Sequence, residues 1–359
     1  MTEMRAASPG EVQVFYTYCH LVHAGNVDHE LGWVAEELAR HGARLSYFLS
    51  VPEPEFYPHY THGLDGLFRF GGCIPAIHVK ADLADTVLLG LQWFWEGGGI
   101  LVRADDEIWC MADLAGRRVG LSRSLNAAKV DYRRVTEERG LELLLRLHGM
   151  RRDDFQTVDR PFLDDWYEGQ GMAEPLPDLL DFWRVYGVQA DLLQRPLQPD
   201  LEAGVIDACF VTDPFGLEYA NSKSVRLVGS LAGQRERTLQ VGGAPYALTC
   251  TRRFADKHPD LVTAYLQGLI RTGRWCNAER RAMAALLEAT GFFPPAATTL
   301  PAIERLDLVP NLSAADLTAI DAVKESMLER GYIRRDFDVD DWGAPEFLLA
   351  AVQALDGAT

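Results

Sequence analysis

The 359-residue sequence predicts an α/β protein built from two lobes, and three observations support this prediction. Short apolar strands alternate with helical stretches along the chain, which is the pattern of sheets covered by helices. The length exceeds what a single hydrophobic core usually serves, so about two domains are expected. With 48% hydrophobic residues, both lobes have enough apolar side chains for a sizeable core.

The chain opens with a strand, a helix and a second strand. Apolar runs at 12–18 and 43–49 are typical of strands, and 32–42 has helical spacing with a terminal glycine. The first strand leads directly into Cys19 and His20. Because ligands of open α/β sheets bind at the carboxyl ends of strands, this position favours a functional role for Cys19.

A loop is expected from Val51 to Phe70, because this stretch is rich in Pro, His, Tyr and Gly. A helical stretch is expected from Gly71 to Leu83. Gly71 and Gly72 stand at its expected start, where first-turn amides lack partners in the helix and the dipole is positive. The pattern indicates an anion-binding position, with an ordinary loop-to-helix turn as the alternative.

The middle of the chain predicts a second α/β lobe. The stretches 86–95, 97–108 and 112–122 alternate short apolar strands with polar turns and continue the parallel-sheet pattern, and the strand-like stretch 155–160 and the stretch 202–220 follow. A long helix is expected within 130–149. The stretch 161–183 is the least regular, and a long loop there would suit a lid over a cleft.

The last third of the sequence is expected to return to the first lobe. A strand is predicted within 239–254, and one amphipathic helix over 258–290. We therefore place the first part of lobe one at 1–103 and lobe two at 104–240. The segment 241–359 forms the return segment and the C-terminal helices of lobe one.

The charge of the chain limits its partners. A net charge of −17 and an isoelectric point near 5.0 argue against nucleic acid or an anionic membrane. A small molecule is the expected partner, and it can be anionic because one or two buried arginines suffice to hold an anion. The N-terminal stretch lacks the features of a secretory signal, so we expect a cytoplasmic protein, a monomer or small homo-oligomer.

Six cysteines are spaced without a CxxC pair or a compact Cys/His cluster. This spacing disfavours disulfide and metal frameworks, and most of the cysteines are expected to be small buried residues. Cys19 is singled out by its place after the first strand. No metal and no organic cofactor is expected.

Three strings resemble the solute-binding proteins of ABC transporters of the nitrate, taurine and alkanesulfonate type. They are DLAGRRVGLS (113–122), GVIDACFVTDP (204–214) and YALTCTRRFADKHPDLV (246–262). The resemblance implies the periplasmic-binding-protein type II fold, with a ligand cleft between the lobes. It is a signal of fold and not of function.

Three other strings resemble the 2'-hydroxybiphenyl-2-sulfinate desulfinase family. They are YTYCHLVHAGN (16–26), HYTHGLDGLFRFGGCIP (59–75) and DDWGAPEFLLAAV (340–352). In that family a nucleophilic Cys follows the first strand, and a His lies ten residues before an Arg that opens an Arg-Phe-Gly-Gly motif. The matching positions are Cys19, His59, Arg69, Phe70, Gly71 and Gly72. His20 stands where the family has Pro and Cys73 where it has an acid, which points to a different substrate.

The resemblance implies cleavage of the carbon–sulfur bond of an aromatic sulfinate with release of sulfite. Arg69 offers a planar fork of donors for two sulfinate oxygens, and the Gly72 amide offers another donor. Cys19 acts either as nucleophile on sulfur or as the acid that protonates the ring carbon. Arg69, a helix amino end and His59 would tune its reactivity, because positive surroundings favour thiolate. His20, His23 and His62 are close in sequence and are alternatives to His59.

Candidates for an aromatic pocket wall are Tyr60, Phe70, Trp93 and Phe215, although aromatic residues at such spacings are more often plain core. Two other functions stay open. One is a non-catalytic solute receptor or ligand sensor for a small sulfonate-like, sulfinate-like or aromatic molecule. The other is a different enzyme on the same scaffold, such as a protein resembling thiamin pyrimidine synthases, although the sequence lacks their cysteine-rich motif.

Overall fold

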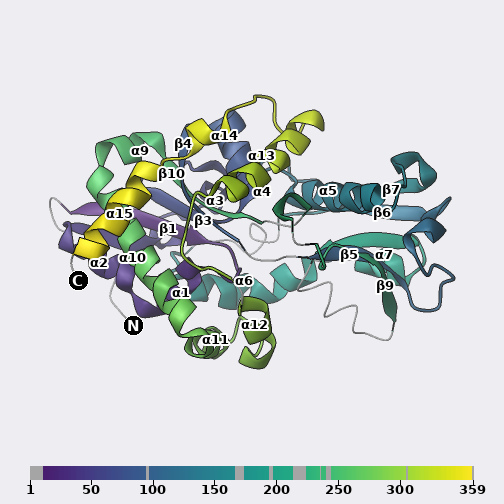
Figure 1. Cartoon of the computed structure of the whole chain (residues 1–359), viewed down its shortest axis with the longest axis horizontal. Coiled ribbons are helices and arrows are strands. Elements are labelled where there is room, and N and C mark those ends of the chain that lie inside the picture. Colours follow the sequence, from purple (N-terminus) through teal and green to yellow (C-terminus); the bar gives the residue numbers. More distant parts are fainter. Residues whose placement is uncertain are drawn as a thin grey trace.

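The structure is a computed structural model that describes residues 11–93, 97–165, 174–193, 197–212, 224–234, 236–239, 244–304 and 306–357. Two lobes lie side by side along the long axis of the molecule (Figure 1). Each lobe is built on its own five-stranded sheet. The two-lobed α/β architecture expected from the sequence is therefore confirmed.

The sheet of lobe one has the strand order β2-β1-β3-β10-β4. Its strands are β1 (Val12–Tyr18), β2 (Ala43–Tyr47), β3 (Leu67–Gly72), β4 (Thr86–Gln92) and β10 (Tyr246–Thr251). β1 is parallel to β2 and β3, whereas β10 runs antiparallel between β3 and β4. The sequence predicts that the chain returns to lobe one. On its return it inserts β10 between β3 and β4, two strands from the first 92 residues.

The sheet of lobe two has the order β7-β6-β8-β5-β9. Its strands are β5 (Gly98–Arg103), β6 (Arg118–Ser124), β7 (Gln156–Phe162), β8 (Ala208–Thr212) and β9 (Val225–Ser230). Because β5 pairs in this second sheet, its membership favours a lobe boundary before Gly98 instead of after residue 103. The three predicted segment limits otherwise stay a prediction.

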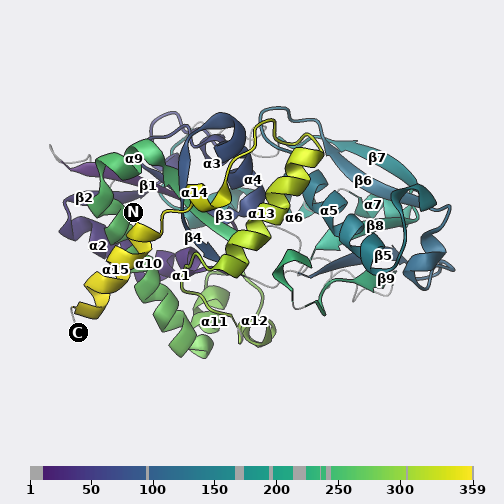
Figure 2. The ribbon, with the colours of Figure 1, turned by 45° about the horizontal axis from the view of Figure 1, so that its top comes forward.

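Helices cover both sheets (Figures 1 and 2). In chain order they are α1 (Ala24–Leu31), α2 (Trp33–Arg40), α3 (Pro58–Thr61), α4 (Cys73–His78), α5 (Tyr132–Leu147), α6 (Leu179–Leu193), α7 (Gln198–Glu202), α9 (Arg252–Lys257), α10 (Pro259–Ala278), α11 (Arg280–Ala289), α12 (Ala296–Ile303), α13 (Ala314–Glu329), α14 (Val339–Trp342) and α15 (Pro345–Gly357). α10 packs against α1, α2 and α15 on lobe one, and α5 packs on the sheet of lobe two.

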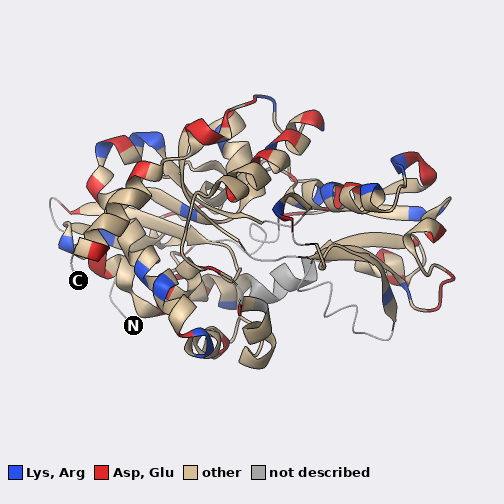
Figure 3. Ribbon diagram, in the orientation of Figure 1, with Lys and Arg blue, Asp and Glu red and all other residues tan. Residues whose placement is uncertain are grey.

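Acidic and basic residues are interspersed along the helices of both lobes (Figure 3). Inside, the strands of lobe one bury an apolar and aromatic core that includes Val14, Tyr16, Phe68 and Leu248. Within the described ranges, none of the helices has the length and apolar character that crossing a membrane requires.

Two local predictions were wrong. Arg69 and the two glycines after it lie on strand β3, which is paired on both sides by β1 and β10, whereas a loop was expected up to Phe70 and a helix from Gly71. The helix expected over 258–290 is two helices, α10 and α11, which separate at Glu279 where the backbone leaves helical geometry.

Candidate active site

A row of buried polar side chains crosses the sheet of lobe one. Thr17 of β1 is in register with Arg69 of β3, and Arg69 is in register with Thr249 of β10. All three are almost fully buried in an otherwise apolar sheet. The two threonines each hold a histidine from the segment that includes α3: Thr17 Oγ1 lies 2.7 Å from His59 Nδ1, and Thr249 Oγ1 lies 2.9 Å from His62 Nε2.

Cys19, His59 and Arg69 meet at the end of this row. The Cys19 Sγ atom lies 3.5 Å from His59 Nε2 and 3.8 Å from Arg69 Nη2. The Cys19 amide donates to the Phe70 carbonyl at 3.0 Å, which ties the residue after β1 to β3. The fold therefore brings Cys19 into contact with His59 and Arg69, which lie 40 and 50 residues further along the chain.

Arg69 is a buried cation whose charge is not balanced by an acid. Its side chain is 0% exposed, and no carboxylate of the described residues lies within ion-pair distance. Its Nε donates to the His59 carbonyl at 2.9 Å and its Nη1 to the Gly72 carbonyl at 3.0 Å. With the thiol contact, three of its five N–H groups are engaged, which leaves donors on both terminal nitrogens for an anion.

His59 is held as a neutral base. Burial lowers its pKa well below 6.5, and the positive charge of Arg69, with further contributions from His62 and Lys129, lowers it in the same direction. When Thr17 Oγ1 accepts the Nδ1 proton, the Nε2 atom is left as an acceptor that faces the thiol. This arrangement suits proton transfer between Cys19 and His59.

Cys19 differs from the other cysteines. It is half-buried, whereas Cys73, Cys209, Cys250 and Cys276 are buried and Cys110 is exposed. Burial raises the pKa of the Cys209 and Cys250 thiols, and that of Cys276 to about 12. Buried thiols of this kind are poor nucleophiles, and the reactive role of Cys19 stays a prediction.

Gly71 of β3 gives the thiol of Cys19 its space. A Cβ atom on Gly71 would lie 2.1 Å from Cys19 Sγ, so a side chain at this position would displace the thiol. Gly72 is the N-cap residue of α4, and its carbonyl, not its amide, contacts Arg69. The predicted role of the Gly72 amide in anion binding stays a prediction.

The aromatic candidates lie in different places. Tyr60 is next to the site, with its ring 5.0 Å from that of His59. Phe70 is fully buried in the core, against His23, and Trp93 lies in a small buried cluster with Ala244 and Ala319. Phe215 lies outside the described residues.

Lobe two reaches the site through Tyr132 and Lys129. The rings of Tyr60 and Tyr132 are stacked, with centroids 6.3 Å apart. The Lys129 ammonium lies 5.1 Å from both rings and forms a buried ion pair with Asp164. Beside them, Asn126 of lobe two donates to the Tyr57 hydroxyl of lobe one at 3.2 Å. The segment that holds His59 is therefore part of the contact between lobes.

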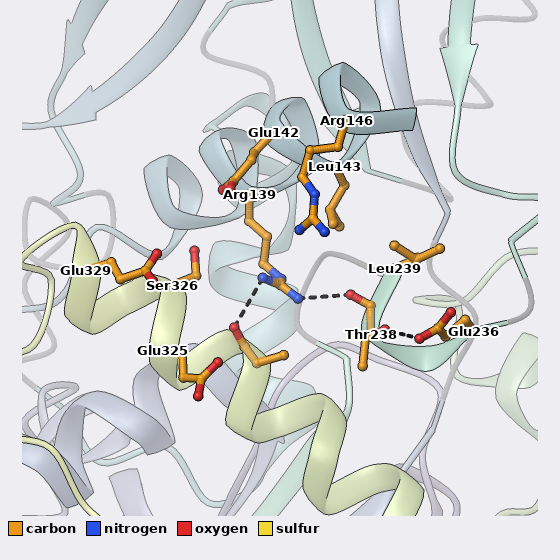
Figure 4. A pocket seen from close by; sticks show the side chains of 11 residues that line it. Arg139, Glu142, Leu143, Arg146, Glu236, Thr238, Leu239, Glu325, Ser326 and Glu329 are labelled. Carbon is orange, nitrogen blue, oxygen red and sulfur yellow. Dashed lines mark hydrogen bonds between the residues drawn. The ribbon is translucent and has the colours of Figure 1, made fainter. Parts of the chain in front are cut away.

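Two cavities flank the lobe junction. One, of about 320 Å³, is lined by the loops after β6 and β7, including Asn126 and Asp164. The other, of about 400 Å³, lies between α5, α13 and the turn Arg237–Leu239, away from Cys19. There Arg139 reaches from α5 toward α13 and donates to the carbonyls of Ala322 and Thr238 (Figure 4).

Thr17, Lys129 and Tyr132 were not anticipated from the sequence. A signal exists for Thr17: it is a polar residue inside an apolar strand, as are Arg69 and Thr249. Lys129 and Tyr132 come from the other lobe, and their contact with the site depends on how the lobes meet. In the part of the chain that the structure describes, no group of three His, Cys, Asp or Glu side chains is placed to hold a metal ion.

No protein-family model matches the chain. The 2'-hydroxybiphenyl-2-sulfinate desulfinases of Rhodococcus erythropolis and Rhodococcus qingshengii are each 25% identical to it over 308 residues. The match covers 81% of this chain and 82% of each relative.

Solved structures show the same fold. A cysteine-to-serine mutant of DSZB in complex with biphenyl-2-sulfinic acid has a TM-score of 0.69 and 21% identity, covering 96% of this chain and 99% of that one. The periplasmic sulfonate-binding protein SsuA of Methylobacillus flagellatus KT has a TM-score of 0.64 and 15% identity, covering 96% and 94%. The chain is thus similar in sequence, at 25% identity, to the 2'-hydroxybiphenyl-2-sulfinate desulfinases, and it has the fold of DSZB and of the periplasmic solute-binding proteins.

Proposed function

We propose that the protein is a desulfinase that breaks the carbon–sulfur bond of an aromatic sulfinate and releases sulfite, with Cys19 as the reacting thiol. The observation that carries this proposal is the contact of the Cys19 thiol with Arg69, a buried arginine that lacks an acidic partner among the described residues. The similarity to desulfinases and to a protein that binds biphenyl-2-sulfinic acid supports the same reaction.

Arg69 binds the sulfinate in this proposal. A sulfinate carries one negative charge over two oxygens, and the free N–H groups of the guanidinium match such a pair in spacing and charge. The buried position strengthens the attraction, because water does not screen it. The same contact places the sulfinate sulfur beside the thiol of Cys19, because Cys19 Sγ lies 3.8 Å from Arg69 Nη2.

The reaction can follow two balanced routes. In the first, the Cys19 thiolate attacks sulfur, and the aryl group leaves with the bonding electron pair and takes a proton at the ring carbon. Water then resolves the Cys–S–SO₂⁻ intermediate to the thiol and hydrogen sulfite. In the second, the thiol protonates the ring carbon, sulfur dioxide leaves, and water converts it to hydrogen sulfite and returns the proton to Cys19.

His59 serves both routes as a neutral base within reach of the thiol. In the first route it accepts the proton of Cys19 when the thiolate forms; in the second, where that proton goes to the ring carbon, it accepts the proton released by water and passes it to the Cys19 thiolate. The ring of the substrate is proposed to lie against Tyr60, with Phe70 and Trp93 behind it as part of the core. No cofactor takes part in either route.

The test is release of sulfite from biphenyl-2-sulfinate and simpler aryl sulfinates by the purified protein. Turnover is expected for the unmodified protein and for Cys110→Ser, which changes an exposed cysteine as a matched control. Cys19→Ser is expected to bind the sulfinate without releasing sulfite. Undiminished turnover by Cys19→Ser would refute the role of Cys19, and failure of the unmodified protein on every aryl sulfinate would refute the reaction.

A second candidate is a receptor or sensor that binds a sulfonate-like or sulfinate-like molecule without converting it. The fold shared with sulfonate-binding proteins supports it. Calorimetric binding of an aryl sulfinate without any sulfite release would select this candidate. A cytoplasmic location and a monomeric or small oligomeric state stay predictions.

A further inference from the structure

The backbone carbonyl of Cys19 is held by an unusual number of donors. It accepts from the Leu21 amide at 2.8 Å, from Asn26 Nδ2 at 2.8 Å and from His23 Nε2 at 3.3 Å. The Cys19 amide is also fixed, by the Phe70 carbonyl. Both polar groups of this backbone unit are thus satisfied within the protein at the point where the chain leaves β1.

The hydrogen bonds define the protonation of His23. The Gly25 amide donates to His23 Nδ1 at 3.1 Å, so Nδ1 is an acceptor and the ring proton is on Nε2. The Nε2–H group is therefore available to the Cys19 carbonyl. The same ring acts twice, since its Nδ1 also provides the N-cap of α1.

The surroundings keep this ring neutral. Burial lowers the pKa of His23 to about 3, and the charge of Arg69 lowers it as well, while the Cys19 carbonyl opposes the shift. The ring packs between Phe70 and Tyr18, with centroids 4.3 Å and 5.5 Å away. A neutral, tightly packed imidazole is a rigid link between a helix end and the loop of the thiol.

We infer that His23 is a positioning residue for the reactive thiol: its Nε2–H group holds the Cys19 carbonyl so that Sγ stays between Arg69 and His59. This inference rests on the proposed function. The required placement is narrow, because Sγ has contacts at 3.5 Å and 3.8 Å on two sides, and on a third side a Cβ atom on Gly71 would lie only 2.1 Å from it. A displacement of about 1 Å can cost about 100-fold in rate.

Two substitutions separate the two tasks of the ring. In His23→Gln, the amide nitrogen can take the place of Nε2 and donate to Cys19, while the acceptor at Nδ1 is lost. In His23→Asn, the amide oxygen takes the place of Nδ1 and preserves the helix cap, while the side chain is too short to reach the Cys19 carbonyl. His41→Gln and His41→Asn, at an exposed histidine, are the matched controls.

The expected result is that His23→Asn keeps its melting temperature and its KM but loses about 100-fold in kcat. His23→Gln is expected to keep most of its kcat while it melts at a lower temperature. The inference is overturned if His23→Gln loses kcat while His23→Asn keeps it. It is also overturned if both variants lose kcat equally or if neither loses it.

A second measurement does not depend on turnover. The rate at which iodoacetamide alkylates Cys19, followed against pH by mass spectrometry, is expected to shift in His23→Asn and to stay near that of the unmodified protein in His23→Gln. If the unmodified protein releases no sulfite, the proposed function fails while this measurement still tests the placement of the thiol. Identical alkylation profiles in all variants would contradict the inference.

Discussion

The site requires glycine at position 71, because its side chain is a single hydrogen. A methyl group there would lie 2.1 Å from Cys19 Sγ and 2.9 Å from Cys19 Cβ. We expect Gly71→Ala to move the thiol away from Arg69 and His59 and to lower kcat about 100-fold. Steady-state kinetics checks this result. Gly63→Ala is the control, because its methyl would meet only the Thr61 hydroxyl, at 3.2 Å; equal activities of the two variants would contradict the expectation.

His62 should make the protein sensitive to acid. Burial lowers its pKa from 6.5 to about 3, and Arg69 adds to the shift. Below pH 6.5 His62 therefore binds a proton in the unfolded chain, whereas in the folded chain it binds one only near pH 3. The stability that this group contributes is complete above pH 6.5 and is lost as the pH falls toward 3.

The change is measurable with His62→Asn, since asparagine tolerates the positive φ of this position. Relative to the variant, the unmodified protein should lose up to about 1.4 kcal/mol of unfolding free energy per pH unit below 6.5. Urea unfolding at pH 7.5, 5.5 and 4.5 provides the comparison. Parallel pH dependences of the two proteins would exclude this role of His62.

At the residue scale, the sequence indicated the candidate residues Cys19, His59 and Arg69, which the structure brings together, but not their hydrogen-bond partners. Cys19 follows a strand, and Arg69 stands two residues before a pair of glycines, so both could be identified from the sequence. Thr17 and His23 act through hydrogen bonds to His59 and to the Cys19 carbonyl. Those contacts follow from strand register and from the packing of α1, which no local pattern encodes.

Among the elements, β3 shows how pairing overrides local preference. Its sequence, LFRFGG, ends in two glycines and follows a segment rich in turn residues, so a loop was expected up to Phe70 and the start of a helix at Gly71. Instead the strand is central, with β1 parallel on one side and β10 antiparallel on the other. Ladder hydrogen bonds to two neighbours outweigh the poor strand propensity of glycine.

The loops after β6 and β7 contain a buried ion pair that invites a stability test. Lys129 and Asp164 have side chains that are each 1% exposed, and Ser124 also donates to Asp164. Asp164→Asn leaves the Lys129 charge buried without its partner, which should cost about 3–5 kcal/mol. Urea unfolding measures the loss, with Asp165→Asn as the neighbouring control.

A double substitution separates this charge effect from packing. Lys129→Met combined with Asp164→Leu removes both charges and should recover most of the stability lost by Asp164→Asn. Unfolding free energies that show no recovery would mean that the hydrogen bonds of Asp164, and not the unpaired charge of Lys129, account for the loss.

On the scale of the whole molecule, the net charge of −17 opposes the approach of an anionic substrate. Acidic residues are distributed over both lobes (Figure 3), so the repulsion acts over distances that salt can screen. We expect kcat/KM for an aryl sulfinate to rise as ionic strength increases from about 0.01 to 0.15 M, where the Debye length falls from about 30 to 8 Å. As a control, alkylation of Cys19 by uncharged iodoacetamide should be insensitive to salt. A fall of kcat/KM with rising ionic strength would contradict the expectation and show that the positive charge of Arg69 dominates the electrostatic field that the substrate meets.

The position of β10 between β3 and β4 also has a consequence for biosynthesis. Residues 98–230 contain the five strands of the sheet of lobe two, whereas the sheet around Arg69 is incomplete until residue 251 has been synthesised. At about 5–20 residues per second, Cys19 waits about 10–50 s on the ribosome before its surroundings are complete. The nascent chain thus carries its reactive thiol unprotected through most of translation, and a reducing compartment or a chaperone that covers the first strand would preserve it.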